Sequence, residues 1–203
     1  KNRCGPRPVN IGTMTLYNDI AEVHTDFSQG ALENTGLSTD IAINGDDGAF
    51  FSIAVAQGNE YREYYTRDGS FKLDSQGRLV TKDGDFAMGE NGIITLDESD
   101  FVVSNRGEVI QNGETVDYLQ IRKFENPESL RKYGFNLLTI TAQTQQGVFE
   151  GTFEQGFVER SNVDSIKEMV DMITVLRAYE SNQKAIQYQD STLDKAVNEV
   201  GRI

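Results

Sequence analysis

The pattern of apolar positions divides the chain into two unlike parts. From Ser161 to about Glu199, apolar residues recur at spacings of three and four, which places them on one side of a long α-helix. Ser161 or Asn162 is the expected N-cap, since a short polar side chain accepts hydrogen bonds from first-turn N–H groups, and Gly201 is the expected stop. The predicted apolar stripe consists of Ile166, Met169, Val170, Ile173, Leu176, Tyr179, Ile186 and Leu193.

Before residue 161 the pattern changes to short strands separated by tight turns. Gly supplies the positive φ that such turns need, and Asn or Asp before it tolerates the left-handed region. The expected turns lie at Asp68-Gly69, Gln76-Gly77, Asp83-Gly84, Asn91-Gly92, Arg106-Gly107 and Asn112-Gly113. The expected strands are 40–45, 50–56, 64–67, 70–73, 78–81, 93–96, 101–104, 108–111, 116–124, 137–142 and 147–159. Such even spacing predicts a mainly β fold, an irregular antiparallel sandwich or barrel-like domain.

Three segments follow from these patterns. Residues 1–24 form an N-terminal arm and extended segment, residues 25–160 a β-rich central domain, and residues 161–203 a C-terminal helix. The rest of the chain offers no second helix of comparable length that could cover the apolar stripe. We therefore expect the stripe to be covered by other subunits or by residues missing from this chain.

Composition narrows the functional class. The net charge of −13 argues against nucleic acid or an anionic membrane as the main partner, and the apolar runs are too short to span a bilayer. Cys4 and His24 are the only residues of their types, which excludes a thiolate zinc cluster and a His-pair metal site. The sequence predicts no metal, no cofactor and no catalytic residue.

An acidic group at Asp97, Glu98 and Asp100 is the remaining candidate for chemistry. It lacks the spacing of a calcium loop, so a solvated turn is the expected role. A hydrolase that uses two carboxylates stays open as an alternative, because folding alone brings such residues together.

Several blocks of residues follow one another in order between about residues 25 and 195. They include 26–36, 40–45 with Phe50-Phe51, Tyr65-Thr66-Arg67-Asp68-Gly69-Ser70-Phe71, Phe124-Glu125-Asn126-Pro127, 155–163 and 168–186. Together these blocks resemble the bacterial flagellar basal-body rod and hook protein family. The C-terminal block is most similar to the distal rod type.

The resemblance implies a structural role in motility and no enzymatic activity. Subunits of the family stack helically into a hollow shaft that carries torque from the motor towards the hook, with terminal helices inside and β domains outside. The implied partners are copies of this chain and other rod and hook axial proteins, and the apolar stripe becomes the expected subunit interface. The implied location is the flagellar basal body outside the cytoplasm, in the periplasm or cell-wall zone, reached by type III export through the channel.

Some features depart from the family pattern. The family begins with an N-terminal helix of some tens of residues, which this chain lacks, so we expect it to be truncated. Gly45 to Phe51 holds an Asp46-Asp47-Gly48 insertion, and a longer loop is expected at Ala56–Tyr64. A proximal rod or hook subunit stays an alternative within the family, and a β-rich surface adhesin or binding module is the alternative from another class.

Overall fold

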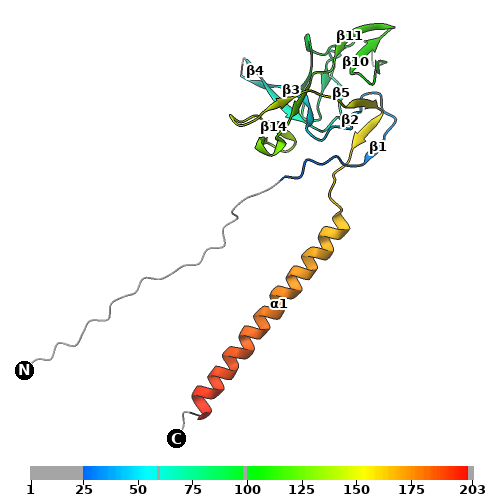
Figure 1. The fold of residues 1–203 in the computed structure, drawn as a ribbon. Helices are drawn as coiled ribbons and strands as arrows, with labels where there is room; N and C mark the ends of the chain where they lie inside the picture. Colours follow the sequence, from blue (N-terminus) through cyan, green and yellow to red (C-terminus); the bar gives the residue numbers. More distant parts are fainter. Residues whose placement is uncertain (1–24, 59, 98–99, 201–203) are drawn as a thin grey trace, which may run out of the picture.

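A β domain with one long projecting helix makes up the part of the chain described by the computed structural model, residues 25–58, 60–97 and 100–200 (Figure 1). The predicted arm, with Cys4 and His24, and the expected stop at Gly201 lie outside these residues. The strands are β1 (Leu32–Asn34), β2 (Ile41–Asn44), β3 (Ala49–Gln57), β4 (Glu60–Thr66), β5 (Lys72–Leu73), β6 (Leu79–Val80), β7 (Phe86–Gly89), β8 (Gly92–Ile93), β9 (Val102–Val103), β10 (Glu108–Gln111), β11 (Glu114–Tyr118), β12 (Ile121–Phe124), β13 (Arg131–Tyr133), β14 (Leu137–Thr139), β15 (Gln146–Gly147), β16 (Thr152–Gln155) and β17 (Phe157–Glu159). The helices are η1 (Pro127–Ser129), α1 (Ser165–Lys195) and the π-helical turn η2 (Ala196–Val200).

The strands pair antiparallel throughout the described residues. The largest sheet has the order β13-β14-β4-β3-β7-β6-β5, and β12 joins it by pairing with β3. A smaller sheet has the order β11-β10-β9, while β16 pairs with β2 and β1 pairs with β17. The predicted fold class is confirmed as mainly β, irregular and antiparallel with a long C-terminal helix, and the sheets stay open rather than closing into a barrel.

The β domain packs its own core. Successive residues of a strand point to opposite faces, so Phe50 and Phe51 in β3 enter two different clusters. The larger cluster is built around Ile41, Phe51 and Ile53, all at most 2% exposed. The smaller one includes Phe50, Tyr65, Phe124, Leu130 and Leu138. Residues of α1 contribute to neither cluster, so the core of the domain does not depend on the helix.

The predicted strand at 116–124 is wrong as a single element. The chain leaves β11 after Tyr118 and enters β12 at Ile121, which moves it from the small sheet to the large one. At the crossing, the Leu119 N–H donates to the Gly107 carbonyl at 2.8 Å and the Gln120 N–H donates to the Met88 carbonyl at 2.9 Å. These bonds to two different elements explain why a continuous apolar pattern does not make one continuous strand.

The predicted loop at Ala56–Tyr64 is also wrong, because β3 and β4 continue as a hairpin through it. The register pairs Val55 with Arg62 and Gln57 with Glu60. Likewise, the predicted strand at 147–159 is wrong as a single element. Residues 148–151 lie in no strand, and Gly156, with a φ of +81°, turns the chain between β16 and β17.

The turn predictions hold at five of their six glycines, which have positive φ: Gly77, Gly84, Gly92, Gly107 and Gly113. Asn112 and Gly113 have φ of 53° and 82°, as a two-residue hairpin turn between β10 and β11 requires. Gly69 differs, because a Cβ there would lie 1.7 Å from the Ile41 carbonyl oxygen. Its role is close backbone approach.

Candidate assembly surfaces

The N-cap of helix α1 lies three residues after Ser161 and two after Asn162, the two expected caps. The cap is Asp164, whose side chain accepts from the N–H of Ile166 at 2.9 Å and of Lys167 at 3.3 Å. Asn162 makes other contacts: its side-chain amide donates to the carbonyl and hydroxyl oxygens of Ser28. Asn162 therefore ties the start of α1, which we call the helix root, to the segment that leads into the β domain.

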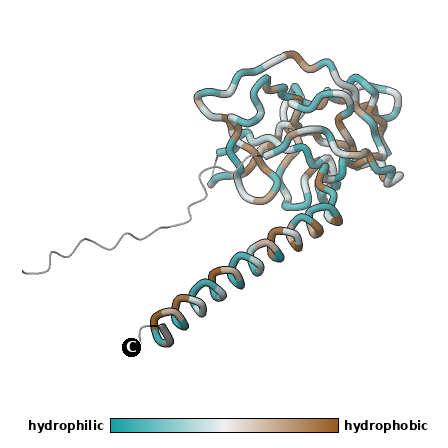
Figure 2. The backbone as a smooth tube through the Cα atoms, turned by 60° about the horizontal axis from the view of Figure 1, so that its bottom comes forward, coloured by the Kyte–Doolittle hydropathy of each residue, from teal (hydrophilic) through white to brown (hydrophobic). Residues whose placement is uncertain are grey.

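The predicted stripe residues all lie on α1 and all face solvent. Their exposed fractions run from 50% at Ile173 to 75% at Ile166. None of the 31 residues of α1 is buried, and apolar and polar positions alternate along the helix (Figure 2). Exposed apolar area of this extent is typical of a surface that another protein covers.

The apolar surface is wider at the helix root than the sequence pattern predicted. With about 3.6 residues per turn, Ile166, Met169, Val170, Ile173 and Leu176 fall within about a third of the circumference. Two residues that the predicted stripe left out widen this face: Met172, 64% exposed, and Val175, 67% exposed. Around the root of α1, apolar side chains therefore extend over more than one side of the helix circumference.

Farther along α1 the apolar residues of the predicted stripe narrow to a seam, and Tyr188, 72% exposed, lies off it. Tyr179, Ile186 and Leu193 follow Met172 at intervals of seven residues, and all are exposed. An ideal helix drifts by about 20° per seven residues, so the seam winds slowly around the axis in a left-handed sense. The later residues of the predicted stripe therefore lie farther around the helix than the first ones. The seven-residue spacing was visible in the sequence and would have pointed to Met172.

At the root of α1, the segment leading into the β domain and the segment leaving it lie side by side. We call these two segments, 26–34 and 157–164, the neck (Figure 1). Strands β1 and β17 pair antiparallel within it, with Leu32 opposite Glu159. Gly30 permits this approach, since a Cβ there would lie 1.8 Å from the Arg160 carbonyl oxygen. The helix root is thus fastened to the domain through backbone contacts.

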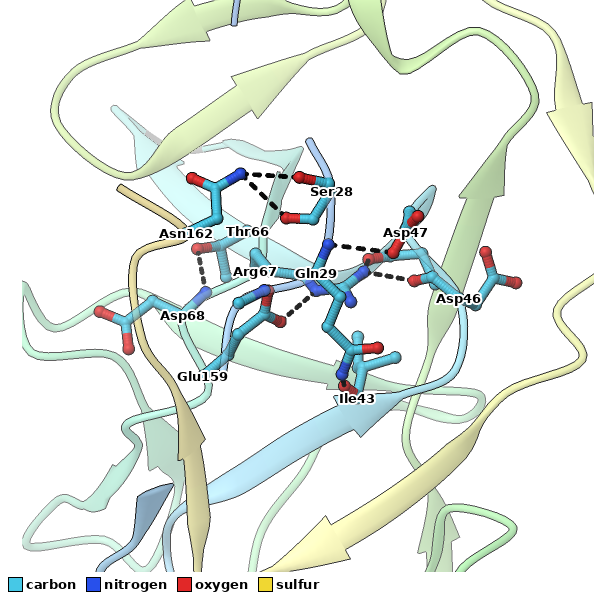
Figure 3. A network of polar contacts seen from close by, with 12 residues as sticks. Ser28, Gln29, Ile43, Asp46, Asp47, Thr66, Arg67, Asp68, Glu159 and Asn162 are labelled. Atoms are coloured by element: carbon cyan, nitrogen blue, oxygen red, sulfur yellow. Dashed lines mark hydrogen bonds and ion pairs between the residues drawn. The ribbon is translucent and has the colours of Figure 1, made fainter. Parts of the chain in front are cut away.

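Arg67, which follows β4, joins the neck to the domain (Figure 3). Its Nε is 2.5 Å from Oε2 of Glu159, and the two side chains are 17% and 11% exposed. Its Nη1 donates to the carbonyls of Asp46 and Ala49, both at 2.6 Å. Glu159 in turn accepts from the Gly30 N–H at 2.9 Å. One half-buried guanidinium therefore holds the turn before β3 and the outgoing strand together.

A second ion pair anchors the same turn. Lys123 Nζ lies 2.9 Å from Oδ2 of Asp46, whose side chain is 4% exposed. The hydrogen bond to Asp46 raises the pKa of Lys123. Gln29 bridges the neck to this region by donating to the Ile43 carbonyl at 2.9 Å and accepting from the Gly45 N–H at 3.0 Å (Figure 3).

The Asp46-Asp47-Gly48 insertion thus has a structural role that the sequence alone did not reveal. The carbonyl of Asp46 accepts from Arg67 and its carboxylate pairs with Lys123. Asp47 accepts from the Gln29 N–H at 3.0 Å. The residues of the neck were part of the recognised sequence blocks, yet nothing in their spacing indicated that Arg67 and Glu159, 92 residues apart, would pair. A cleft of about 470 Å³ borders the neck.

Within the described residues, no group of three or more His, Cys, Asp or Glu side chains is arranged to hold a metal ion. In the same part of the chain, no helix has both the length and the apolar character needed to cross a membrane. The described residues form a domain with its own core and an exposed helix, and this exposed helix offers a surface for assembly.

Comparison with known proteins identifies the family. The flagellar basal-body rod protein FlgG of Borreliella burgdorferi is 38% identical over 193 residues, which are 88% of this chain and 71% of that protein. The chain belongs to the flagellar basal-body rod and hook protein family. FlgG of Bacillus subtilis is 36% identical over 96% of the chain and 76% of its own length, and FlgF of Rhizobium meliloti is 31% identical over 93% and 78%.

Two family profiles match separate parts of this rod and hook family chain. The one described as the flagellar hook protein FlgE/F/G D1 domain matches residues 42–111, which span β2 to β10. The one described as the flagellar basal body rod FlgEFG protein C-terminal matches residues 154–199, which include β17, the outgoing half of the neck and α1. The suspected family is therefore confirmed, and the FlgG relatives make the chain distal-rod-like.

Proposed function

We propose that this chain is a structural subunit of the bacterial flagellar basal-body rod, of the distal-rod type, which assembles helically with copies of itself into the drive shaft that transmits torque to the hook. The observation that carries the proposal is α1, a 31-residue helix without a buried residue, rooted on a domain that has its own core. The chain is a structural protein and not an enzyme. The relatives that cover most of it are named as rod proteins, which does not favour an adhesin.

The proposed subunit interface is the predicted stripe on α1, extended by Met172 and Val175. Full burial of one large apolar side chain contributes about 1.5–3 kcal/mol. Burying the exposed halves of eight such side chains then contributes about 6–12 kcal/mol, comparable with the roughly 4–15 kcal/mol that association costs. The wide apolar face at the helix root allows contact with neighbouring subunits on more than one side, whereas the narrow seam allows contact on one side only.

The proposed roles in the rod follow the segments of the chain. Residues 161–203 supply the inner, helical layer and residues 25–160 the outer β layer. The proposed partners are copies of this chain and the other rod and hook axial proteins. We also propose that the subunit works outside the cytoplasm, in the periplasm or cell-wall zone, because a shaft that reaches the hook has to pass through this zone.

Replacing Ile173 by Asp in the cell's own copy of the protein tests the interface. A carboxylate in an apolar contact that repeats in every subunit costs several kcal/mol each time, so we expect no rods and no swimming. The β domain keeps its fold, because α1 contributes nothing to its core, and this is checked by circular dichroism of the purified variant.

Ser181→Asp is the matched control, since it adds the same charge to the same helix on the side away from the seam. We expect this variant to assemble rods. Normal motility with Ile173→Asp would overturn the proposed interface, and loss of assembly with both variants would show that any added charge on α1 is harmful.

A further inference from the structure

The β domain carries two exposed apolar patches of opposite charge. The first, which we call the basic hairpin, is formed by β13, β14 and the turn between them, residues 131–140. Phe135 at its tip is 98% exposed, Tyr133 is 43% exposed and Ile140 is 48% exposed. The segment holds Arg131 and Lys132 and no carboxylate. Both cations are exposed, and neither forms an ion pair with another described residue.

The second patch, which we call the acidic sheet, is the exposed face of β9, β10 and β11. Val102 and Ile110 lie opposite each other on this face, and Tyr118 pairs with Glu108 in the same layer. Val102 is 57%, Val116 42% and Tyr118 40% exposed.

Carboxylates lie in and next to the strands of the acidic sheet, with Glu108 opposite Tyr118 and Glu114 opposite Gln111 at the turn end of β11. Asp100, Glu108 and Glu114 are exposed or half-exposed, against one cation, Arg106, in residues 100–118. A fourth carboxylate, Asp117, is buried and accepts from the Asn91 side chain at 3.0 Å. The acidic sheet is thus an apolar surface with an excess of negative charge on its rim.

The two patches lie on opposite sides of the domain, with β14 near the helix root and β10 and β11 at the far side (Figure 1). Because β13 and β11 are each the outermost strand of their sheets, both patches stand at free edges. A copy of the chain cannot bring its own hairpin onto its own acidic sheet across the packed core. A neighbouring copy can bring it there.

We propose that the basic hairpin of one copy docks on the acidic sheet of the next, with Phe135 entering the apolar surface of Val102, Ile110 and Val116. The contact joins two different patches, so it is heterologous and repeats without closing, as a helical shaft requires. Opposite charge on the two patches sets the direction of docking and disfavours contacts between like patches. The contact rests on the proposed function, and it assigns to the β domain an assembly role separate from that of α1.

Mixing two charge-reversed variants of the full chain tests this contact. Both carry Ile173→Asp, which removes the helix contact. One also carries Arg131→Glu and Lys132→Glu, and the other carries Glu108→Lys and Glu114→Lys. Sedimentation equilibrium up to about 1 mM protein covers the range of weak contacts.

We expect the Ile173→Asp parent to associate into open-ended oligomers, more weakly at about 0.5 M than at about 0.05 M salt. Each charge-reversed variant alone has a dissociation constant raised at least about tenfold. Their equimolar mixture regains the parent's open-ended association, because the unchanged acidic sheet of one variant complements the unchanged basic hairpin of the other, and the two reversed patches complement each other as well. No association of the parent, or no recovery in the mixture, overturns the contact.

Phe135→Ser checks the apolar half of the contact without a change of charge. The side chain is 98% exposed, so its loss leaves the thermal stability of the monomer unchanged, and any lost association comes from contact between copies. Val148→Ser, at a residue 78% exposed elsewhere on the domain, is the control and should associate as the parent does. If Phe135→Ser also associates normally, the docking is wrong, while rods that still depend on Ile173 would leave the proposed function standing.

Discussion

Replacing Arg67 by Met removes the charged side chain that joins the neck to the β domain while keeping most of its apolar length. The change deletes the ion pair with Glu159 and both hydrogen bonds to the carbonyls of Asp46 and Ala49. Glu159 keeps only the Gly30 N–H as a partner for its half-buried carboxylate. We expect the neck to loosen and the domain to lose stability.

Removing one partner of a buried ion pair costs about 3–5 kcal/mol. The neighbouring cleft of about 470 Å³ lets water reach the groups that lose their partner, which places the loss near the lower limit, about 3 kcal/mol. Each kcal/mol lowers the Tm of a chain of this size by about 2–4 °C. The expected drop in Tm is therefore about 6–12 °C.

Thermal unfolding of the full chain, followed by circular dichroism in the β region, measures this drop. Arg160→Met is the matched control, because its ion pair with Glu33 lies in the same neck but the two side chains are 67% and 48% exposed. Such exposed pairs contribute about 0–1 kcal/mol, so we expect little change. A Tm for Arg67→Met equal to that of Arg160→Met would refute the view that Arg67 fastens the neck.

Three further predictions concern the neck, the helix cap and pH. Gly30→Ala forces a Cβ against the Arg160 carbonyl, and overpacking of this kind costs about 1–3 kcal/mol, measured as a lower Tm; an unchanged Tm would contradict it. Asp164→Ala removes the cap of α1 at a cost of about 1 kcal/mol, seen as faster hydrogen exchange in the first turn, whereas Ser161→Ala should leave that exchange unchanged. Burial raises the pKa of Tyr65 from 10.0 to about 12, so the folded state holds this proton longer than the unfolded state, and stability falls as pH rises through that window. Tyr65→Phe should make this fall smaller, and an equal fall in both proteins would argue against the burial effect.

The sequence predicted the elements whose signal is local. Turn glycines such as Gly77 and Gly113 need positive φ wherever they occur, so their positions mark the hairpins. The apolar spacing from residue 166 onward likewise identified the helix without knowledge of its surroundings. The family resemblance came from ordered blocks that include Arg67, though not from any knowledge of what Arg67 contacts.

Features that depend on distant contacts could not be predicted in this way. The strand expected at 116–124 breaks because Leu119 and Gln120 bond to two different elements, and no spacing within the strand reveals this. The N-cap is Asp164 rather than Asn162, because the side chain of Asn162 is hydrogen-bonded to Ser28, more than a hundred residues away in sequence. The pairing of Arg67 with Glu159 is likewise a product of the tertiary fold.

The central claim is that the apolar stripe of α1 is covered by neighbouring subunits in the rod. Labelling Ile173→Cys with a maleimide, in a chain where Cys4 is replaced by Ser, measures this directly. In the free chain this position is exposed, so the thiol should react readily, and in intact rods it should react at least about tenfold more slowly, because desolvated contacts exclude the reagent. Reactivity should return when the rods are dissociated. Equal reactivity in rods and in the free chain would contradict the account.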